Sequence, residues 1–220
     1  MRRRLDPTLY LVTDTELSRP RHVPDVVRKA VAGGVTAVQV RDKQASRRAL
    51  YELTLAVREA LTSTPDVALV VNDAVDVAVL ADADGVHVGQ DDLPPTEVRR
   101  LIGPDRLLGL SVGTADDLAA ALALPSGVLD LIGLSPVWAT PTKPDAGREL
   151  GLEGARVLAE AARAAGLPSA AIGGIRASNA ASVAATGVNG ICVVSDICAA
   201  PDPTEAARRL RDSIEQGRRR

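Results

Sequence analysis

The sequence is very poor in aromatic residues: of 220 residues, two are Tyr, one is Trp and none is Phe. Any core must therefore be filled by Val, Leu, Ile and Ala. Hydrophobic residues make up 46% of the chain, and a chain of this length can bury a sizeable core from them. With this share of hydrophobic residues, we expect a folded chain rather than a disordered one.

The sequence also has no excess of basic charge, few cysteines and no long apolar run, and each of these limits the classes of protein to which the chain can belong. The net charge of −2 gives no basic excess, which argues against nucleic-acid binding. The two cysteines, Cys192 and Cys198, lie in or near an apolar run, which predicts buried thiols rather than a disulfide or a metal pair. No apolar run reaches 18 residues and no signal-peptide pattern opens the chain, so we expect a cytoplasmic protein without a membrane partner.

What the chain does contain is an alternation of short β-branched runs with longer stretches rich in Ala, Leu, Arg and Glu. The expected strands are 9–14, 36–42, 68–73, 85–89, 107–112, 129–137, 168–174 and 190–196. The expected helices are 24–32, 46–62, 75–82, 95–102, 115–123, 152–165, 178–186 and 203–214. Residues typical of helix starts, such as Ser46, Thr114 and Ser178, open several of the helices.

Strands that are apolar on both faces and are joined by helices indicate a parallel sheet covered on both sides. Eight such units in 220 residues predict a single (β/α)8 TIM barrel over residues 1–220. The Arg-rich tails, residues 1–6 and 216–220, are expected to be disordered. A doubly wound open sheet is the alternative, but no GxGxxG motif follows the first strand.

The polar residues gather where the expected strands end, which is the edge at which TIM barrels carry their chemistry. Gln39, Arg41 and Lys43 follow one another at a spacing of two and should share one inward face if the strand continues. Buried cations need an anionic partner. That partner is either a carboxylate in a structural ion pair, from Asp42 or a neighbouring strand, or a bound phosphate chain.

Two carboxylates end adjacent expected strands, Asp73 on the third and Asp92 after the fourth. Mg²⁺ takes one or two protein carboxylates and fills its other positions with water or phosphate oxygens. Taken alone, Asn72 and Asp73 would also serve as an ordinary turn cap. Considered together with the cations of the second strand, the two carboxylates favour a metal site more strongly than they do alone.

A second anion site is indicated at strands seven and eight, where IGGI (172–175) and VVS (193–195) occur. Many barrels bind a phosphate monoester at this place through backbone amides. The glycines could equally serve tight packing. The loop ATPTKP (139–144) lies between the two sites. His87 is predicted to be an interior histidine rather than a general base.

The motifs QVRDK, VND, GVHVGQDD, TPTK, AIGGI and VVS, in this order and spacing, closely resemble the thiamine phosphate synthase family over nearly the whole chain. The resemblance implies a Mg²⁺-dependent transferase with one metal ion per subunit. It would join 4-amino-2-methyl-5-(diphosphooxymethyl)pyrimidine to 4-methyl-5-(2-phosphoethyl)thiazole and release pyrophosphate by a dissociative substitution. The implied partners are these two phosphorylated small molecules, and a homo-oligomer is left open.

The resemblance also implies roles for individual residues. Arg41, Lys43, Lys143 and Ser111 would be catalytic, and Asp73 and Asp92 would hold the metal. The pyrimidine diphosphate would be bound by Gln39, Val40, Arg41, Asp42, Lys43, Asn72, Ser111 and Lys143. The thiazole phosphate would be bound by Thr140, Pro141, Thr142, Gly174, Val194 and Ser195.

Three positions depart from the family pattern. Ser135 stands where the family commonly has glycine, Ala139 where proline is frequent, and Asp196 where a small residue follows VVS. Because a carboxylate would repel a bound phosphate, Asp196 is expected to face away and join a helix cap.

Two alternatives remain. A thiazole tautomerase paralogue on the same fold binds only the thiazole phosphate, and Lys43, Asp73, Asp92 and Lys143 argue against it because it needs no diphosphate site. A non-catalytic sensor of phosphorylated ligands is the alternative from another class, and no partner-binding tail or DNA-binding element supports it.

Overall fold

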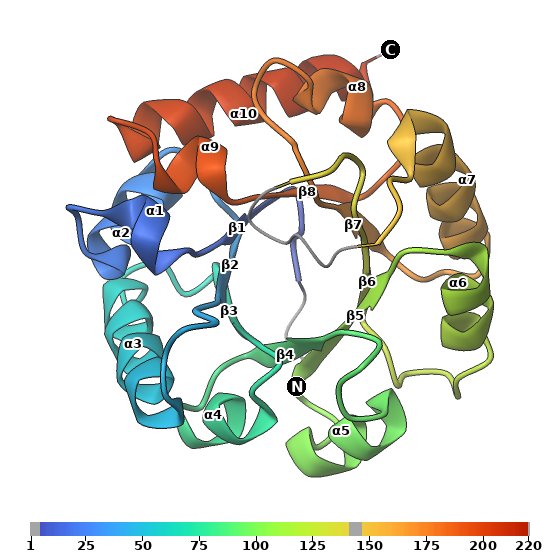
Figure 1. Ribbon diagram of the computed structural model, residues 1–220, viewed down its shortest axis with the longest axis horizontal. Helices are drawn as coiled ribbons and strands as arrows, with labels where there is room; N and C mark the ends of the chain where they lie inside the picture. Colours follow the sequence, from blue (N-terminus) through green and yellow to red (C-terminus); the bar gives the residue numbers. More distant parts are fainter. Residues whose placement is uncertain (1–4, 141–146, 220) are drawn as a thin grey trace.

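A computed structural model describes residues 5–140 and 147–219 of the chain. Eight parallel strands close into one barrel in the order β1-β2-β3-β4-β5-β6-β7-β8, and helices surround it (Figure 1). The strands are β1 (Leu9–Val12), β2 (Ala37–Val40), β3 (Ala68–Asn72), β4 (Gly85–Val88), β5 (Leu107–Val112), β6 (Leu131–Leu134), β7 (Ser169–Ala171) and β8 (Gly190–Val193). The predicted TIM barrel is confirmed, and the open-sheet alternative is wrong because β1 pairs with β8.

The helices follow the strands in turn. They are α1 (Thr15–Ser18), α2 (Val23–Ala32), α3 (Arg47–Ala60), α4 (Val75–Leu80), α5 (Pro95–Ile102), α6 (Ala115–Leu122), α7 (Gly151–Ala164), α8 (Ala180–Ala184), α9 (Ser195–Cys198) and α10 (Pro203–Arg218). The sequence pattern missed α1 and α9, which are each one turn long and too short to show a helical period. Within residues 5–140 and 147–219, no helix has the length and apolar character needed to cross a membrane.

Side-chain caps explain several helix starts. Ser46 accepts a hydrogen bond from the Ala49 backbone N–H, and Thr114 forms a capping box with Asp117. Ser178 does not cap its helix, because α8 begins at Ala180 after Asn179. The Asn179 side chain bridges the preceding loop instead, since it accepts from the Arg176 N–H and donates to the Gly174 carbonyl.

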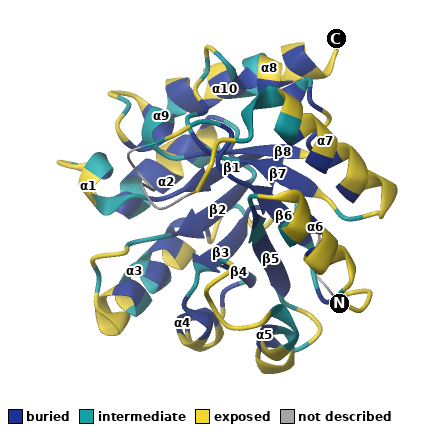
Figure 2. Cartoon of the chain, turned by 45° about the vertical axis from the view of Figure 1, so that its right-hand side comes forward, coloured by how far each residue is buried: buried dark blue, intermediate teal, exposed yellow. Residues whose placement is uncertain are grey.

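The core has two layers, as expected for strands that are apolar on both faces. In β3, Leu69 and Val71 pack outward against the helices, whereas Ala68 and Val70 point into the barrel. The barrel interior is filled by small and medium side chains around the ring of Tyr10. The strands and the inner faces of the helices are buried, and the exposed residues lie on the outer helix faces and loops (Figure 2).

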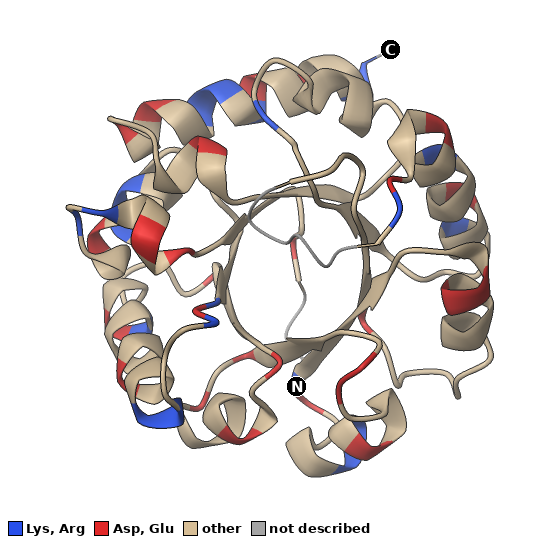
Figure 3. Ribbon diagram, viewed as in Figure 1, with Lys and Arg blue, Asp and Glu red and all other residues tan. Residues whose placement is uncertain are grey.

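Charged residues are concentrated on the helices and loops, and the strands carry almost none (Figure 3). One ion pair closes the end of the barrel where the strands begin. Arg99 of α5 contacts Asp130 at 2.7 Å, and both side chains are more than 80% buried. The same guanidinium donates to the carbonyls of Val128, Gly103 and Arg106, and Asp130 accepts from the Leu108 N–H. Every hydrogen bond here ties a loop at the barrel's amino-terminal end.

The chain is ordered further towards both ends than expected. Leu5 packs against the barrel interior, and Asp6 accepts a hydrogen bond from the Thr8 N–H. At the other end, α10 continues through Arg218, whose guanidinium donates to the Asn189 carbonyl. The predicted disorder therefore does not apply to residues 5–6 and 216–218.

Candidate active site

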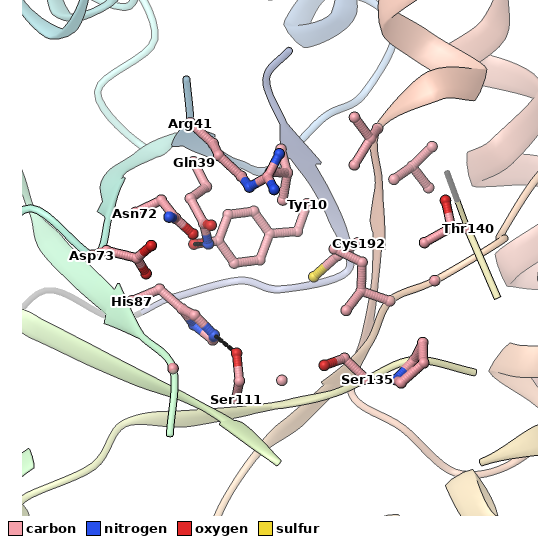
Figure 4. A pocket seen from close by; sticks show the side chains of 18 of the residues that line it. Tyr10, Gln39, Arg41, Asn72, Asp73, His87, Ser111, Ser135, Thr140 and Cys192 are labelled. Carbon is pink, nitrogen blue, oxygen red and sulfur yellow. Dashed lines mark hydrogen bonds between the residues drawn. The ribbon is translucent and has the colours of Figure 1, made fainter. Parts of the chain in front are cut away.

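A cavity of about 280 Å³ opens at the carboxyl ends of the strands (Figure 4). The predicted site residues on its wall are Gln39, Arg41, Lys43, Asn72, Asp73, Asp92, Ser111, Thr140, Gly174, Val194 and Ser195. The polar rim predicted from the strand ends is thus assembled around one cavity. Pro141, Thr142 and Lys143 lie outside the described residues.

Two predicted binding residues are not part of the cavity wall. Val40 is fully buried and packs in the outer core layer. The Asp42 carboxylate accepts hydrogen bonds from the Thr15 hydroxyl and from the Gln44 and Ala45 backbone N–H groups, so it holds the loop after β2. Both lie on the opposite side of the strand from Gln39 and Arg41, because side chains alternate along an extended chain. Their side chains are structural rather than ligand-facing.

The cationic side of the cavity is built on β2. Gln39 is 5% exposed, and its Nε2 donates to the Tyr10 hydroxyl at 3.2 Å. Beyond the strand, the buried Thr13 hydroxyl fixes the backbone of Arg41: it accepts from the Arg41 N–H at 3.0 Å and donates to the Arg41 carbonyl at 3.2 Å. The Arg41 guanidinium is therefore presented from a backbone held on both sides.

The carboxylates of Asp73 and Asp92 come together beside these cations. Burial first, and the charge of Asp92 second, raise the pKa of Asp73 to about 6. Asp73 has φ 59°, a left-handed conformation that is uncommon for a residue other than glycine. Asp92 is oriented by the Gly89 backbone N–H, which donates to its Oδ2 at 2.7 Å. Two carboxylates are thus held close together at the cost of mutual repulsion.

The unusual pKa of Asp73 leads to a prediction about stability in metal-free buffer. A native pKa of about 6 against 3.8 means that the folded protein binds the extra proton, so this group's stabilisation is lost as pH rises from about 4 to 6. Asp73→Asn removes the charge and keeps a residue that tolerates positive φ. We expect the variant to unfold at a higher temperature than the parent above pH 6, with no advantage below pH 4.

The measurement is thermal unfolding in EDTA across pH 4 to 8, with the exposed Asp66→Asn as the matched control. An Asp73→Asn variant that is less stable than the parent at pH 7.5, or whose advantage does not change with pH, would contradict the prediction.

Between the two sides of the cavity, His87 of β4 contacts Ser111 of β5, with 3.1 Å between Nε2 and Oγ. Glycines on the next strands make room for the imidazole, because a Cβ at Gly109 would come within 2.2 Å of its Nδ1 and a Cβ at Gly133 within 3.0 Å of its Cε1. Gln90 also reaches this place and donates to the Ser111 carbonyl at 2.6 Å. His87 is an interior histidine, as predicted, but it also lines the cavity.

The opposite side of the cavity is formed by the chain after β7 and β8. Gly173 and Gly174 have φ of 110° and 65°, and a Cβ on Gly173 would collide with Pro136, at 2.8 Å. Ser195, expected at the end of a strand, is the first residue of α9. Asp196 faces away from the cavity, as predicted, but it does not cap a helix: it accepts a hydrogen bond from the Ala177 N–H, in the turn before α8, at 2.9 Å. The carboxylate therefore supports the loop after β7.

An apolar wall that sequence reasoning missed lies deeper in the barrel. Tyr10, Leu131, Ile172 and Cys192 all line the cavity. Both cysteines are free and buried, as predicted, and burial raises the pKa of the Cys192 thiol to about 12. Burial also raises the pKa of Tyr10, so its hydroxyl stays protonated. The wall offers an uncharged, largely apolar surface next to the charged rim.

These features define a TIM-barrel protein whose rim cavity suits phosphorylated ligands: cations and paired carboxylates on one side, glycine amides on the other, and an apolar floor. Comparison with known proteins agrees. The chain belongs to the thiamine monophosphate synthase family, whose model matches residues 9–197.

Individual relatives cover almost all of the chain. A thiamine-phosphate synthase of Azorhizobium caulinodans is 47% identical over 97% of this chain and 98% of its own. One of Vibrio parahaemolyticus is 48% identical over 92% of this chain and 95% of its own. The structure of a thiamine phosphate pyrophosphorylase from Pyrococcus furiosus superposes with a TM-score of 0.85 at 36% identity, and the match covers 97% of this chain and 98% of that one.

Proposed function

We propose that this protein is a thiamine phosphate synthase. It would join 4-amino-2-methyl-5-(diphosphooxymethyl)pyrimidine to 4-methyl-5-(2-phosphoethyl)thiazole, giving thiamine phosphate and pyrophosphate. The observation that carries the proposal, beside the family membership, is that one cavity holds two different sides suited to anions. Two phosphorylated substrates that react with each other need one cavity with a separate anion-binding side for each of them.

The pyrimidine diphosphate is assigned to the side built on β2 to β5. Arg41 and Lys43 bring positive charge to this side, and Asn72 and Ser111 add polar groups. Gln39 lies below them with its Nε2 engaged by Tyr10, which leaves the amide oxygen suited to accept from the pyrimidine amino group. Lys143 would complete this side from the loop after β6.

Asp73 and Asp92 fit a magnesium ion. Their oxygens are the hard ligands that Mg²⁺ prefers. Burial first and the charge of Asp92 second raise the pKa of Asp73, and a divalent cation would relieve the second of these effects. Among the described residues there is no group of three or more His, Cys, Asp or Glu side chains that could hold a metal, so an ion held by these two carboxylates would take its other ligands from water or phosphate oxygens. When bound, Mg²⁺ would neutralise negative charge on the diphosphate.

The thiazole phosphate is assigned to the other side, with Thr140, Gly174, Val194 and Ser195. The glycine backbone at 173–174 adopts positive φ, and a Cβ on either residue would meet residues 136–139, so glycine lets these two segments lie close together at the cavity wall. Thr142 and Pro141 would extend this side.

The proposed reaction is dissociative. The bond between the pyrimidinylmethyl carbon and the diphosphate oxygen breaks first, and the thiazole nitrogen then bonds to the resulting cation. The protein's own contribution is to hold the leaving pyrophosphate with fixed cations and to keep water from the cation. The apolar wall of Tyr10, Leu131 and Ile172 supports the second task.

The test is to incubate the full chain with both substrates and MgCl₂ and to follow thiamine phosphate and pyrophosphate together. We expect equal amounts of the two products, and none when either substrate is omitted or EDTA is added. Isomerisation of the thiazole without coupling would assign the protein to the tautomerase alternative instead.

A further inference from the structure

One polar side chain of the cavity has no role in the assignments above. Ser135 follows β6 and is 8% exposed. Its hydroxyl points into the cavity (Figure 4). Within residues 5–140 and 147–219, no side chain or backbone group forms a hydrogen bond with its Oγ. The residue is buried except where it borders the cavity, so a hydroxyl without a protein partner there is available to a bound ligand.

The backbone around this hydroxyl is held firmly. The Ser135 N–H donates to the Val112 carbonyl at 3.0 Å, which continues the β5–β6 ladder past the end of the strand. The Pro136 carbonyl accepts from the Leu150 N–H at 2.9 Å, and the Val137 N–H donates to the Ile172 carbonyl at 2.9 Å. The backbone of Ser135 is thus fixed between neighbouring strands, so the position of its Cβ at the cavity wall is set before any ligand arrives.

The surroundings indicate which substrate is concerned. In the closed barrel, β6 stands across from β2, which carries the diphosphate side. The residues that follow Ser135 belong to the other side: the backbone of Gly173 packs against Pro136, and that of Gly174 against Trp138. The other described lining residues from β6 and β7 and their ends are Leu131, Gly133, Pro136, Ile172, Gly173, Gly174 and Ile175. None of these has a polar side chain, so Ser135 and Thr140, which lies in the loop after β6, supply the polar side chains of this part of the wall.

We propose that Ser135 is a binding residue for the acceptor substrate, a heteroaromatic phosphate monoester, and that its hydroxyl hydrogen-bonds to that substrate and fixes its orientation against the apolar wall. This inference rests on the proposed function for the identity of the acceptor. A directional hydrogen bond beside an apolar wall favours one orientation of a flat ring, which can bind such a wall in more than one way.

The experiment compares Ser135→Ala and Ser135→Gly with the parent and with Ser182→Ala, which changes an exposed serine of α8. Binding of 4-methyl-5-(2-phosphoethyl)thiazole is measured by calorimetry, and KM values for both substrates are measured by product formation. We expect both Ser135 variants to bind the thiazole phosphate about tenfold more weakly, which is the loss of one hydrogen bond. KM for the pyrimidine diphosphate and the unfolding temperature should stay unchanged, and Ser182→Ala should equal the parent.

The outcomes separate this inference from the proposed function. If the parent binds the thiazole phosphate but forms no thiamine phosphate, the proposed function fails and the calorimetric comparison still decides the role of Ser135. Unchanged thiazole binding in both variants, or no thiazole binding by the parent, would overturn the role. A loss confined to KM for the pyrimidine diphosphate, or a loss matched by lower thermal stability, would overturn it as well.

Discussion

Replacement of Asp92 by Asn is expected to lower kcat for thiamine phosphate formation by about 100-fold or more, because a neutral amide cannot replace a carboxylate that holds a divalent cation beside the departing diphosphate. The substitution is conservative in shape. An Asn side-chain oxygen can still accept the hydrogen bond from the Gly89 N–H, so the local loop should persist. The magnesium concentration that gives half-maximal activity should rise at the same time.

The unfolding temperature of the Asp92→Asn variant shows whether this carboxylate binds the metal ion or stabilises the fold. Burial first and the charge of Asp92 second raise the pKa of Asp73. Removing the Asp92 charge therefore relieves a repulsion, and the metal-free variant should unfold at the same temperature as the parent or slightly higher. Asp66→Asn, at an exposed position, is the matched control and should keep full activity. Parallel losses of activity and thermal stability in Asp92→Asn would show that the carboxylate serves the fold.

Replacement of Arg41 by Ala is expected to reduce kcat/KM for the pyrimidine diphosphate by about 100- to 1,000-fold, the size of effect seen when a preorganised group that stabilises developing negative charge is removed. The Thr13 hydroxyl fixes the Arg41 backbone through two hydrogen bonds, and a residue at this position keeps both whatever its side chain. The loss should therefore come from the guanidinium alone.

Arg41→Lys tests whether charge or shape is needed. Lysine keeps one positive charge but cannot form the paired hydrogen bonds of a guanidinium to phosphate oxygens, so an intermediate activity is expected. Both variants should leave calorimetric binding of the thiazole phosphate unchanged, since Arg41 lies on the other side of the cavity. An Arg41→Ala enzyme with activity near that of the parent would remove Arg41 from the catalytic assignment.

The barrel and most of its rim were predictable from the sequence for one physical reason. Parallel strands place their carboxyl ends at one edge, so polar residues that end successive strands must converge. Arg41, Asp73 and Asp92 were found in this way. Val40 and Asp42 came instead from the family resemblance, which carries over every residue of a motif, and neither lines the cavity, because only alternate side chains of a strand can face one side.

The apolar wall could not be found by the same route. Tyr10 and Cys192 stand in runs that are apolar on both faces, so no alternation of polar and apolar residues marks which side chains point inward. The register of the closed barrel decides this, and register is a property of all eight strands together. The role of Ser135 was hidden for a related reason: its burial and the absence of a described hydrogen-bond partner appear only when the strands around it are in place.

The ion pair of Arg99 and Asp130 has a consequence for the evolution of the barrel. It ties the loops where the strands begin, whereas the cavity lies where they end. Substitutions at sites that share no partners combine nearly additively. Substitutions that stabilise the end of the barrel where the strands begin can therefore accumulate in evolution independently of substitutions that change ligand preference at the end where the cavity lies.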